Sequence, residues 1–261
     1  MRSIATRRNH WRGGKEWEKP NMRNPWNALV AEIAGTFLFF FVGIGAAASI
    51  DRAVFSGAAI DGASGLLVVA LAHGVVLAVL VSSLGAVSGA HFNPAVTFGV
   101  WIAGQIPGRR AGAYILAQLI GGILAALAVR VVFPAAISPT LGRPAVGAGI
   151  DPIAAIGVEA ILTMVLLLAV FGTAIDPRGP KVGGLAIGLA VGADILMGGP
   201  LTGGAMNPAR WFGPAAVTGV WDNSFVWIIG PLLGAAVAAL AYRYFFLPEA
   251  DLLRTPAEPT A

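Results

Sequence analysis

The chain has 261 residues, of which 57% are hydrophobic and only 11% are charged. A composition this apolar excludes an ordinary soluble domain and indicates an integral membrane protein, so the net charge of +4 is no argument for nucleic-acid binding. The absence of cysteine excludes disulfides and thiolate metal sites, and the three histidines lack metal-ligand spacing, so no cofactor and no metal are expected.

The first 27 residues are polar and basic, and we interpret residues 1–27 as a cytoplasmic N-terminal tail. They are not a secretory signal, because the apolar run that follows is too long and no small-residue cleavage site closes it. A second polar tail is predicted at 248–261, which leaves 28–247 as the membrane domain.

Six apolar segments are long enough to cross roughly 30 Å of hydrocarbon as helices. They are predicted at 28–50, 64–87, 111–133, 153–174, 182–199 and 224–247. The sequence therefore predicts an all-α membrane protein with six transmembrane helices.

The basic residues orient these helices. If both termini are cytoplasmic, the inner side holds Arg2, Arg7, Arg8, Arg12, Lys15, Lys19, Arg23, Arg109, Arg110, Arg178, Lys181, Arg243 and Arg254. The outer side then holds only Arg52, Arg130 and Arg143. This asymmetry follows the positive-inside rule, and the cell (inner) membrane is the expected location.

A short stretch occurs twice, as Asn93-Pro94-Ala95 and Asn207-Pro208-Ala209. Asn is a favoured N-cap and Pro fits the first helical position, so each copy predicts a helix start. The apolar runs that follow, at 94–103 and 208–218, are too short to span a bilayer. Each copy is therefore predicted to be a re-entrant half-helix with its positive dipole end at the Asn.

The half-helices belong to an internal repeat, in which three spans with a half-helix after the second occur at 28–133 and again at 153–247. An odd number of spans inverts the second copy, and inverted repeats place their equivalent features face to face at the midplane. Irregular backbone at that depth persists only where it is buried in protein or lines a wet cavity. The two loops before the half-helices are therefore predicted to line a pore.

At this point the sequence resembles the aquaporin (major intrinsic protein) family over residues 28–247. The resemblance lies in both Asn-Pro-Ala motifs, the Arg210 that follows Asn207, the glutamates Glu32 and Glu159, and Gly230-Pro231. It implies a homotetramer with one pore in each protomer, and passive diffusion without a cofactor.

The resemblance also implies two constrictions. Asn93 and Asn207 form the midplane one, where each amide donates a hydrogen bond to passing water and the converging helix dipoles oppose cations. The outer, narrower one is a selectivity filter placed by motif at His73, Ile195, Gly204 and Arg210. This set is similar to that of some plant vacuolar (tonoplast-type) aquaporins, which pass ammonia as well as water.

Physically, Ile195 and Gly204 give the filter one apolar wall and extra width, while Arg210 supplies hydrogen-bond donors and repels cations. We therefore expect water and small neutral solutes such as ammonia and hydrogen peroxide to pass. Glycerol facilitators typically carry Asp after the filter Arg, whereas this chain has Trp211, which argues against that subfamily. Glycerol or small-polyol transport is kept as the alternative.

Four further polar residues need a role inside the membrane. Glu32 and Glu159 are expected to accept hydrogen bonds from the backbone of the half-helix loops, and His91 to support the first loop. Asp194 departs from the family pattern and stays open. It either bonds loop backbone behind the filter, or faces Arg210 or His73. If it faces His73, its charge would favour the imidazolium form of His73 and a pH-dependent permeability.

Functions of other classes fit the sequence less well. An ion-coupled secondary transporter also uses inverted repeats and broken helices, but it needs an ionisable group at the midplane, where the loops carry asparagines and no carboxylate. An enzyme is not expected, because the chain offers no metal site and no obvious pair of nucleophile and base.

Overall fold

The structure is a computed structural model that describes residues 25–246, so the predicted tails at 1–27 and 248–261 lie outside it except for residues 25–27. Its helices are α1 (Pro25–Phe55), α2 (Gly62–Ser88), α3 (Pro94–Ile102), α4 (Gly108–Val132), α5 (Pro152–Val170), α6 (Gly184–Thr202), α7 (Pro208–Thr218) and α8 (Ser224–Ala241). Two π-helical turns extend α5 and α8, namely η1 (Phe171–Ile175) and η2 (Tyr242–Phe246).

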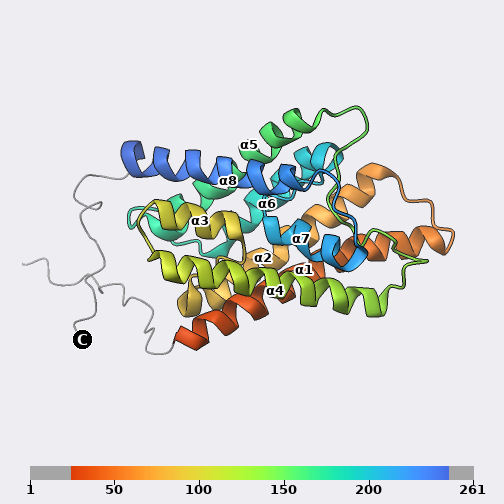
Figure 1. Ribbon diagram of the computed structural model, residues 1–261, viewed down its shortest axis with the longest axis horizontal. Coiled ribbons are helices and arrows are strands. Elements are labelled where there is room, and N and C mark those ends of the chain that lie inside the picture. Colours follow the sequence, from red (N-terminus) through yellow and green to blue (C-terminus); the bar gives the residue numbers. More distant parts are fainter. Residues whose placement is uncertain (1–24, 247–261) are drawn as a thin grey trace, which may run out of the picture.

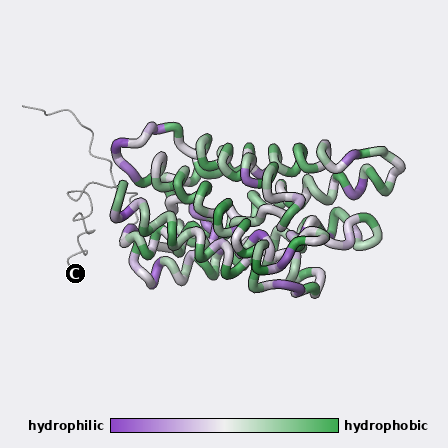
Figure 2. Tube along the Cα trace, turned by 90° about the horizontal axis from the view of Figure 1, so that it is seen from above, coloured by the Kyte–Doolittle hydropathy of each residue, from purple (hydrophilic) through white to green (hydrophobic). Residues whose placement is uncertain are grey.

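The prediction of six membrane spans is confirmed, since six of the described helices are long and apolar enough to cross a membrane. Apolar segments dominate the length of the bundle, and hydrophilic segments gather toward its two ends (Figure 2). The first helix is longer than predicted. It runs to Phe55 rather than to residue 50. The prediction stops where the apolar run ends, at the polar pair Asp51-Arg52, whereas the helical backbone continues through that pair.

The two half-helices lie in the middle of the bundle with their N-termini toward each other (Figure 1). α3 has 9 residues and α7 has 11. At a rise of about 1.5 Å per residue, each covers about half of the hydrocarbon thickness. Together they form one broken span, surrounded by the six long helices.

Small residues allow the central helices α2 and α6 to pack closely. A Cβ placed on Gly74 would lie 2.7 Å from the carbonyl oxygen of Gly188, and one placed on Gly188 would lie 2.9 Å from the backbone nitrogen of Ala78. Such close approach is the usual device for helix packing in membranes, where hydrophobic burial gives little drive. It brings the ends of α2 and α6, from which the two loops leave, to the centre of the molecule.

The loop between η1 and α6, at one end of the bundle, is organised by the buried Asp176. Its carboxylate accepts hydrogen bonds from Arg178 Nε (2.9 Å), Arg178 Nη2 (2.6 Å) and the Tyr242 hydroxyl (3.1 Å). The hydrogen bond from the Arg178 guanidinium holds the pKa of Asp176 well below its usual range. The hydrogen bond from Tyr242, the first residue of η2, ties the loop to the end of α8.

Candidate functional site

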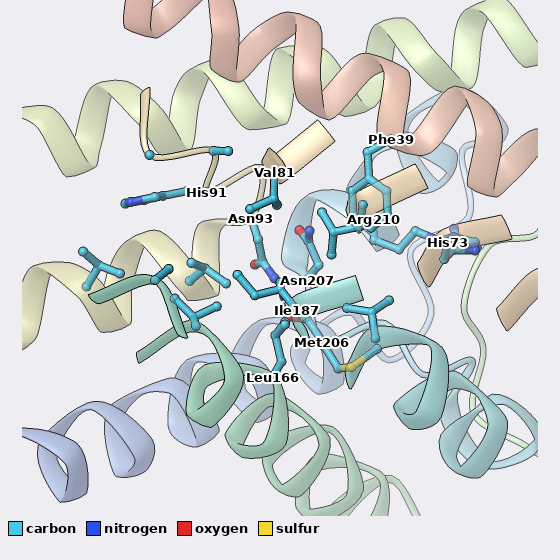
Figure 3. A pocket seen from close by; sticks show the side chains of 18 of the residues that line it. Phe39, His73, Val81, His91, Asn93, Leu166, Ile187, Met206, Asn207 and Arg210 are labelled. Carbon is cyan, nitrogen blue, oxygen red and sulfur yellow. Dashed lines mark hydrogen bonds between the residues drawn. The ribbon is translucent and has the colours of Figure 1, made fainter. Parts of the chain in front are cut away.

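A cavity of about 570 Å³ runs along the half-helix loops, from His91 near one end to His73 and Arg210 near the other (Figure 3). The predicted site residues that line it are His73, His91, Asn93, Ile195, Gly204, Asn207 and Arg210. The predicted residues outside the lining are Glu32, Glu159, Asp194, Pro94, Ala95, Pro208 and Ala209. Residues from both repeats therefore share one continuous space.

The two asparagines lie side by side at the junction of α3 and α7. Each caps its own half-helix, because Oδ1 of Asn93 accepts from the backbone N–H of Ala95 (2.8 Å) and Oδ1 of Asn207 from that of Ala209 (3.0 Å). Each amide nitrogen also donates to the backbone of the other repeat, from Asn93 to Met206 (2.9 Å) and from Asn207 to Phe92 (3.0 Å). One amide hydrogen of each side chain then remains for the cavity.

Glu32 holds the first loop. It is fully buried and accepts hydrogen bonds from the Ser88 hydroxyl (2.6 Å) and from the backbone N–H groups of His91 (3.0 Å) and Phe92 (2.8 Å). A fourth hydrogen bond comes from Gln118 Nε2 (2.8 Å). These contacts satisfy loop backbone that no helix or sheet satisfies at this depth.

Glu159 does the same for the second loop. It accepts from the Thr202 hydroxyl (2.6 Å) and from the backbone N–H groups of Ala205 (2.9 Å) and Met206 (2.7 Å). Both carboxylates therefore face loop backbone rather than the cavity, and the loops keep a fixed shape.

Arg210 and His73 are bonded to each other at the end of the cavity opposite His91. Arg210 Nε donates to His73 Nε2 (3.0 Å), and Arg210 Nη2 donates to the carbonyl oxygen of Gly142 (2.8 Å). His73 Nδ1 donates to the carbonyl oxygen of Val69 (2.8 Å). Because the guanidinium only donates and the carbonyl only accepts, this arrangement requires a neutral imidazole with its proton on Nδ1.

Arg210 Nη1 is buried without a hydrogen-bond partner among the described residues. A buried cationic donor left unsatisfied is costly. Arg210 is thus both anchored at Nε and Nη2 and short of one acceptor.

The cavity wall formed by Ile195 and Gly204 at this end carries little side-chain bulk. Ile195 is buried on α6, and Gly204 adopts a left-handed backbone with φ of 54°. A Cβ on Gly204 would lie 3.2 Å from the Cα of Ile195, so glycine allows the loop to pass directly over the helix. The wall therefore presents one branched apolar side chain and backbone.

Two residues that position His73 were missed by the sequence reasoning. Phe39 packs edge-on against the imidazole, with ring centroids 5.8 Å apart. Gly43 leaves room for the ring, because a Cβ there would overlap His73. Neither carries a motif, since their role depends on a contact between helices that no local pattern encodes.

Asp194 makes neither of the contacts weighed for it. No hydrogen bond joins it to described loop backbone, to Arg210 or to His73. The two ring nitrogens of His73 bond to the Val69 carbonyl and to Arg210 instead. Its side chain is buried behind the cavity wall, and Oδ2 has no partner among the described residues. The structure offers no imidazolium at His73 for Asp194 to stabilise.

The opposite end of the cavity carries His91 and Lys181. His91 Nδ1 lies 3.0 Å from the Thr97 hydroxyl, and its ring packs edge-on against Tyr114. Lys181 Nζ donates to the carbonyl oxygen of Asp176 (3.3 Å), in the loop between η1 and α6. No carboxylate lines the cavity in the part of the chain that the structure describes.

Comparison with known proteins gives consistent matches over nearly the whole chain. Residues 16–242 match the family model "Major intrinsic protein". The chain is 43% identical to "Aquaporin TIP4-4" of Zea mays over 236 residues, covering 89% of this chain and 92% of that protein. It is 44% identical to "Probable aquaporin TIP3-2" of Arabidopsis thaliana over 234 residues, covering 86% and 85%.

Among solved structures, an aquaglyceroporin from Plasmodium falciparum superposes with a TM-score of 0.74. The match covers 88% of this chain and 100% of that chain at 24% identity, which establishes a shared fold.

Proposed function

The chain belongs to the major intrinsic protein family, and on this premise we propose that it is a passive transmembrane channel for water and small neutral solutes. One observation carries the proposal. Two N-cap asparagines, each bonded to the backbone of the opposite repeat, line a single cavity that ends at an anchored arginine. Members of this family are channels, so the chain is an integral multi-pass membrane protein and not an enzyme.

Exclusion of ions and protons follows from the midplane. The positive ends of α3 and α7 converge at Asn93 and Asn207, where a cation meets two helix dipoles in a low-dielectric setting. The free amide hydrogen of each Asn donates to the oxygen of a passing water, so that water accepts on both sides and cannot continue a proton wire. Arg210 adds a fixed positive charge farther out.

We propose that His73, Ile195, Gly204 and Arg210 act as the selectivity filter. The Arg210 guanidinium supplies hydrogen-bond donors to the permeant, while Ile195 and the bare backbone at Gly204 leave width on the facing wall. The bond between His73 and Arg210 fixes both side chains, so the opening has a defined size. Water, ammonia and hydrogen peroxide fit such a filter.

Transport of glycerol is the second candidate, because the solved structure with this fold is described as an aquaglyceroporin. Trp211 argues against it. Its ring is buried and stacks on Trp227, with centroids 5.3 Å apart, so the residue after Arg210 packs behind the filter instead of offering an acceptor to a polyol. Coupled transport is disfavoured because no carboxylate lines the cavity within the described residues.

Domain limits, topology and assembly are part of the proposal. We propose a channel domain at 28–247 with repeats at 28–133 and 153–247, flanked by cytoplasmic tails at 1–27 and 248–261. The bundle end that carries Arg109, Arg110, Arg178, Lys181 and Arg243 then faces the cytoplasm. Family membership supports a homotetramer, and the names of the relatives do not favour the cell (inner) membrane over another membrane.

The test is stopped-flow light scattering on proteoliposomes with water, glycerol and ammonia measured in parallel. Water permeability well above that of empty vesicles supports the channel. Permeability equal to that of empty vesicles overturns it, and glycerol flux faster than water flux would favour the polyol facilitator.

A further inference from the structure

The two repeats correspond residue for residue across the loops, at a separation of 114 positions (93 to 207). Ser88 and Thr202 both donate a hydroxyl to the loop glutamate of their own repeat. The backbone φ angles also match, at 92° and 82° for Gly89 and Gly203. They match again at 51° for Ala90 and 54° for Gly204, and at 48° for Phe92 and 51° for Met206.

The same separation relates the cavity-lining residues of the long helices. His73, Leu77 and Val81 on α2 line the cavity at intervals of four, which is one face of a helix. Their counterparts 114 positions on are Ile187, Val191 and Ile195 of α6, and these line it as well. The pseudo-twofold relation therefore extends from the loops to the walls.

This relation assigns a counterpart to each residue of the outer filter. His73 corresponds to Ile187, Ile195 to Val81, Gly204 to Ala90 and Arg210 to Val96. All four counterparts line the cavity, and all four are apolar. Because the repeats are inverted, they lie on the other side of the asparagines, in the half of the cavity that ends at His91. Figure 3 shows Val81 and Ile187 beside the asparagines, between His91 and Arg210.

The chemistry of the two sets differs. Where the outer set offers a guanidinium and an imidazole, the inner set has no side chain that donates or accepts a hydrogen bond. Val81, Val96 and Ile187 are packed into the wall and expose 9%, 4% and 5% of their surface, so they cannot turn aside. A Cβ on Gly184 would lie 2.7 Å from the Cβ of Val81, which shows how closely α2 is supported there.

We propose that Val81, Ala90, Val96 and Ile187 form a second selectivity ring, which favours permeants with a weak demand for hydrogen bonds, such as ammonia, over water. The proposal rests on the proposed channel function and deepens it. Water that enters the ring gives up hydrogen bonds that no side chain replaces, whereas ammonia, a weaker hydrogen-bonding solute, gives up less. The outer filter then excludes charge, and the inner ring sets the ratio of ammonia to water.

The test replaces a ring valine with threonine, which adds a hydroxyl at nearly constant volume. Val81→Thr and Val96→Thr are each expected to raise water permeability by about threefold or more, the equivalent of one modest hydrogen bond. Ammonia permeability changes less, so the ratio of ammonia to water falls. The matched control is Val79→Thr, two residues from Val81 on the outer face of α2, where the side chain is 57% exposed.

A size variant separates polarity from width. Val96→Ala enlarges the ring without adding a hydroxyl, and it is expected to admit larger solutes while leaving the ratio of ammonia to water near that of wild type. Equal permeabilities in Val81→Thr, Val96→Thr and Val79→Thr would overturn the ring, as would an Ala variant that lowers the ratio as much as the Thr variants do. Protein content and helical circular dichroism are measured for every vesicle batch, so that each comparison is made at equal folded protein. A wild-type protein with no water permeability would overturn the channel itself.

Discussion

The proposed outer filter depends on a glycine of a neighbouring helix, and Gly43→Ala is expected to disable it. A Cβ at residue 43 would lie 2.6 Å from His73 Cδ2 and Cε1, whereas ordinary contacts begin near 3.4 Å. Nε2 would lie closer still, so the imidazole must move by roughly 1 Å or more, away from α1 and toward the cavity that it lines. Such a shift disrupts the 3.0 Å hydrogen bond from Arg210 Nε to His73 Nε2.

The loss has two measurable parts. A hydrogen bond to a charged group contributes about 1.5–3 kcal/mol, so the free energy of unfolding falls by about that amount. The displaced ring also narrows the opening, and a rise of about 1.4 kcal/mol in the barrier lowers flux tenfold. We therefore expect about tenfold lower water permeability in stopped-flow assays, with a lower melting temperature in detergent.

Gly45→Ala is the matched control on the same helix. No atom lies within 4 Å of a Cβ placed there, so the substitution meets no steric conflict. Alanine is favoured over glycine in a helix by about 0.5–1 kcal/mol, and this variant should be at least as stable as wild type with unchanged flux. If Gly43→Ala matches Gly45→Ala in both stability and permeability, the proposed positioning of His73 is wrong.

Three further predictions follow from individual contacts. Glu32→Gln is expected to lower the melting temperature more than Glu159→Gln, because Glu32 accepts four hydrogen bonds and Glu159 three. Gly204→Ala is expected to fold, because the corresponding residue of the first repeat is an alanine with nearly the same φ, and to slow hydrogen peroxide more than water in flux assays. Asp176→Asn is expected to be less stable than wild type at pH 7. That difference should stay constant above about pH 5 and shrink below about pH 4, because Arg178 lowers the pKa of Asp176 and its contribution is lost only as the carboxylate becomes protonated.

Each of these has a contrary outcome. Equal melting temperatures for the two glutamine variants would mean that the loops do not depend on the carboxylates to different degrees. A Gly204→Ala protein with an unchanged ratio of hydrogen peroxide to water flux would remove Gly204 from the filter. A stability difference for Asp176→Asn that persists undiminished at pH 3 would show that charge at Asp176 is not its source.

The fold was predictable because its main signals are local or repeated. Long apolar runs predict spans, and the sequence Asn-Pro predicts a helix start whether or not the rest of the fold is known. An odd number of spans in a repeat fixes the inversion. The exact ends were less predictable, as the extension of α1 to Phe55 illustrates, because hydropathy and helical hydrogen bonding do not stop at the same residue.

The contacts of the site were less accessible from sequence. The chain indicates that His73 and Arg210 lie near each other, but not that they are bonded, nor that the bond requires a neutral imidazole. That detail rests on the carbonyl of Val69, one turn earlier in α2, and on space left by Gly43 of α1, which only the packing of the two helices sets. Asp194 shows the opposite problem. Its charge drew attention in the sequence, yet the structure turns it behind the wall without a partner among the described residues.

The most direct test of the central claim measures water and proton flux in the same proteoliposomes. Stopped-flow light scattering reports the water, and a trapped pH-sensitive dye reports the protons under an imposed pH gradient. We predict water permeability well above that of empty vesicles, with proton flux no higher than in empty vesicles, because Asn93 and Asn207 interrupt the water chain at the midplane. Proton flux that rises together with water flux would contradict this account.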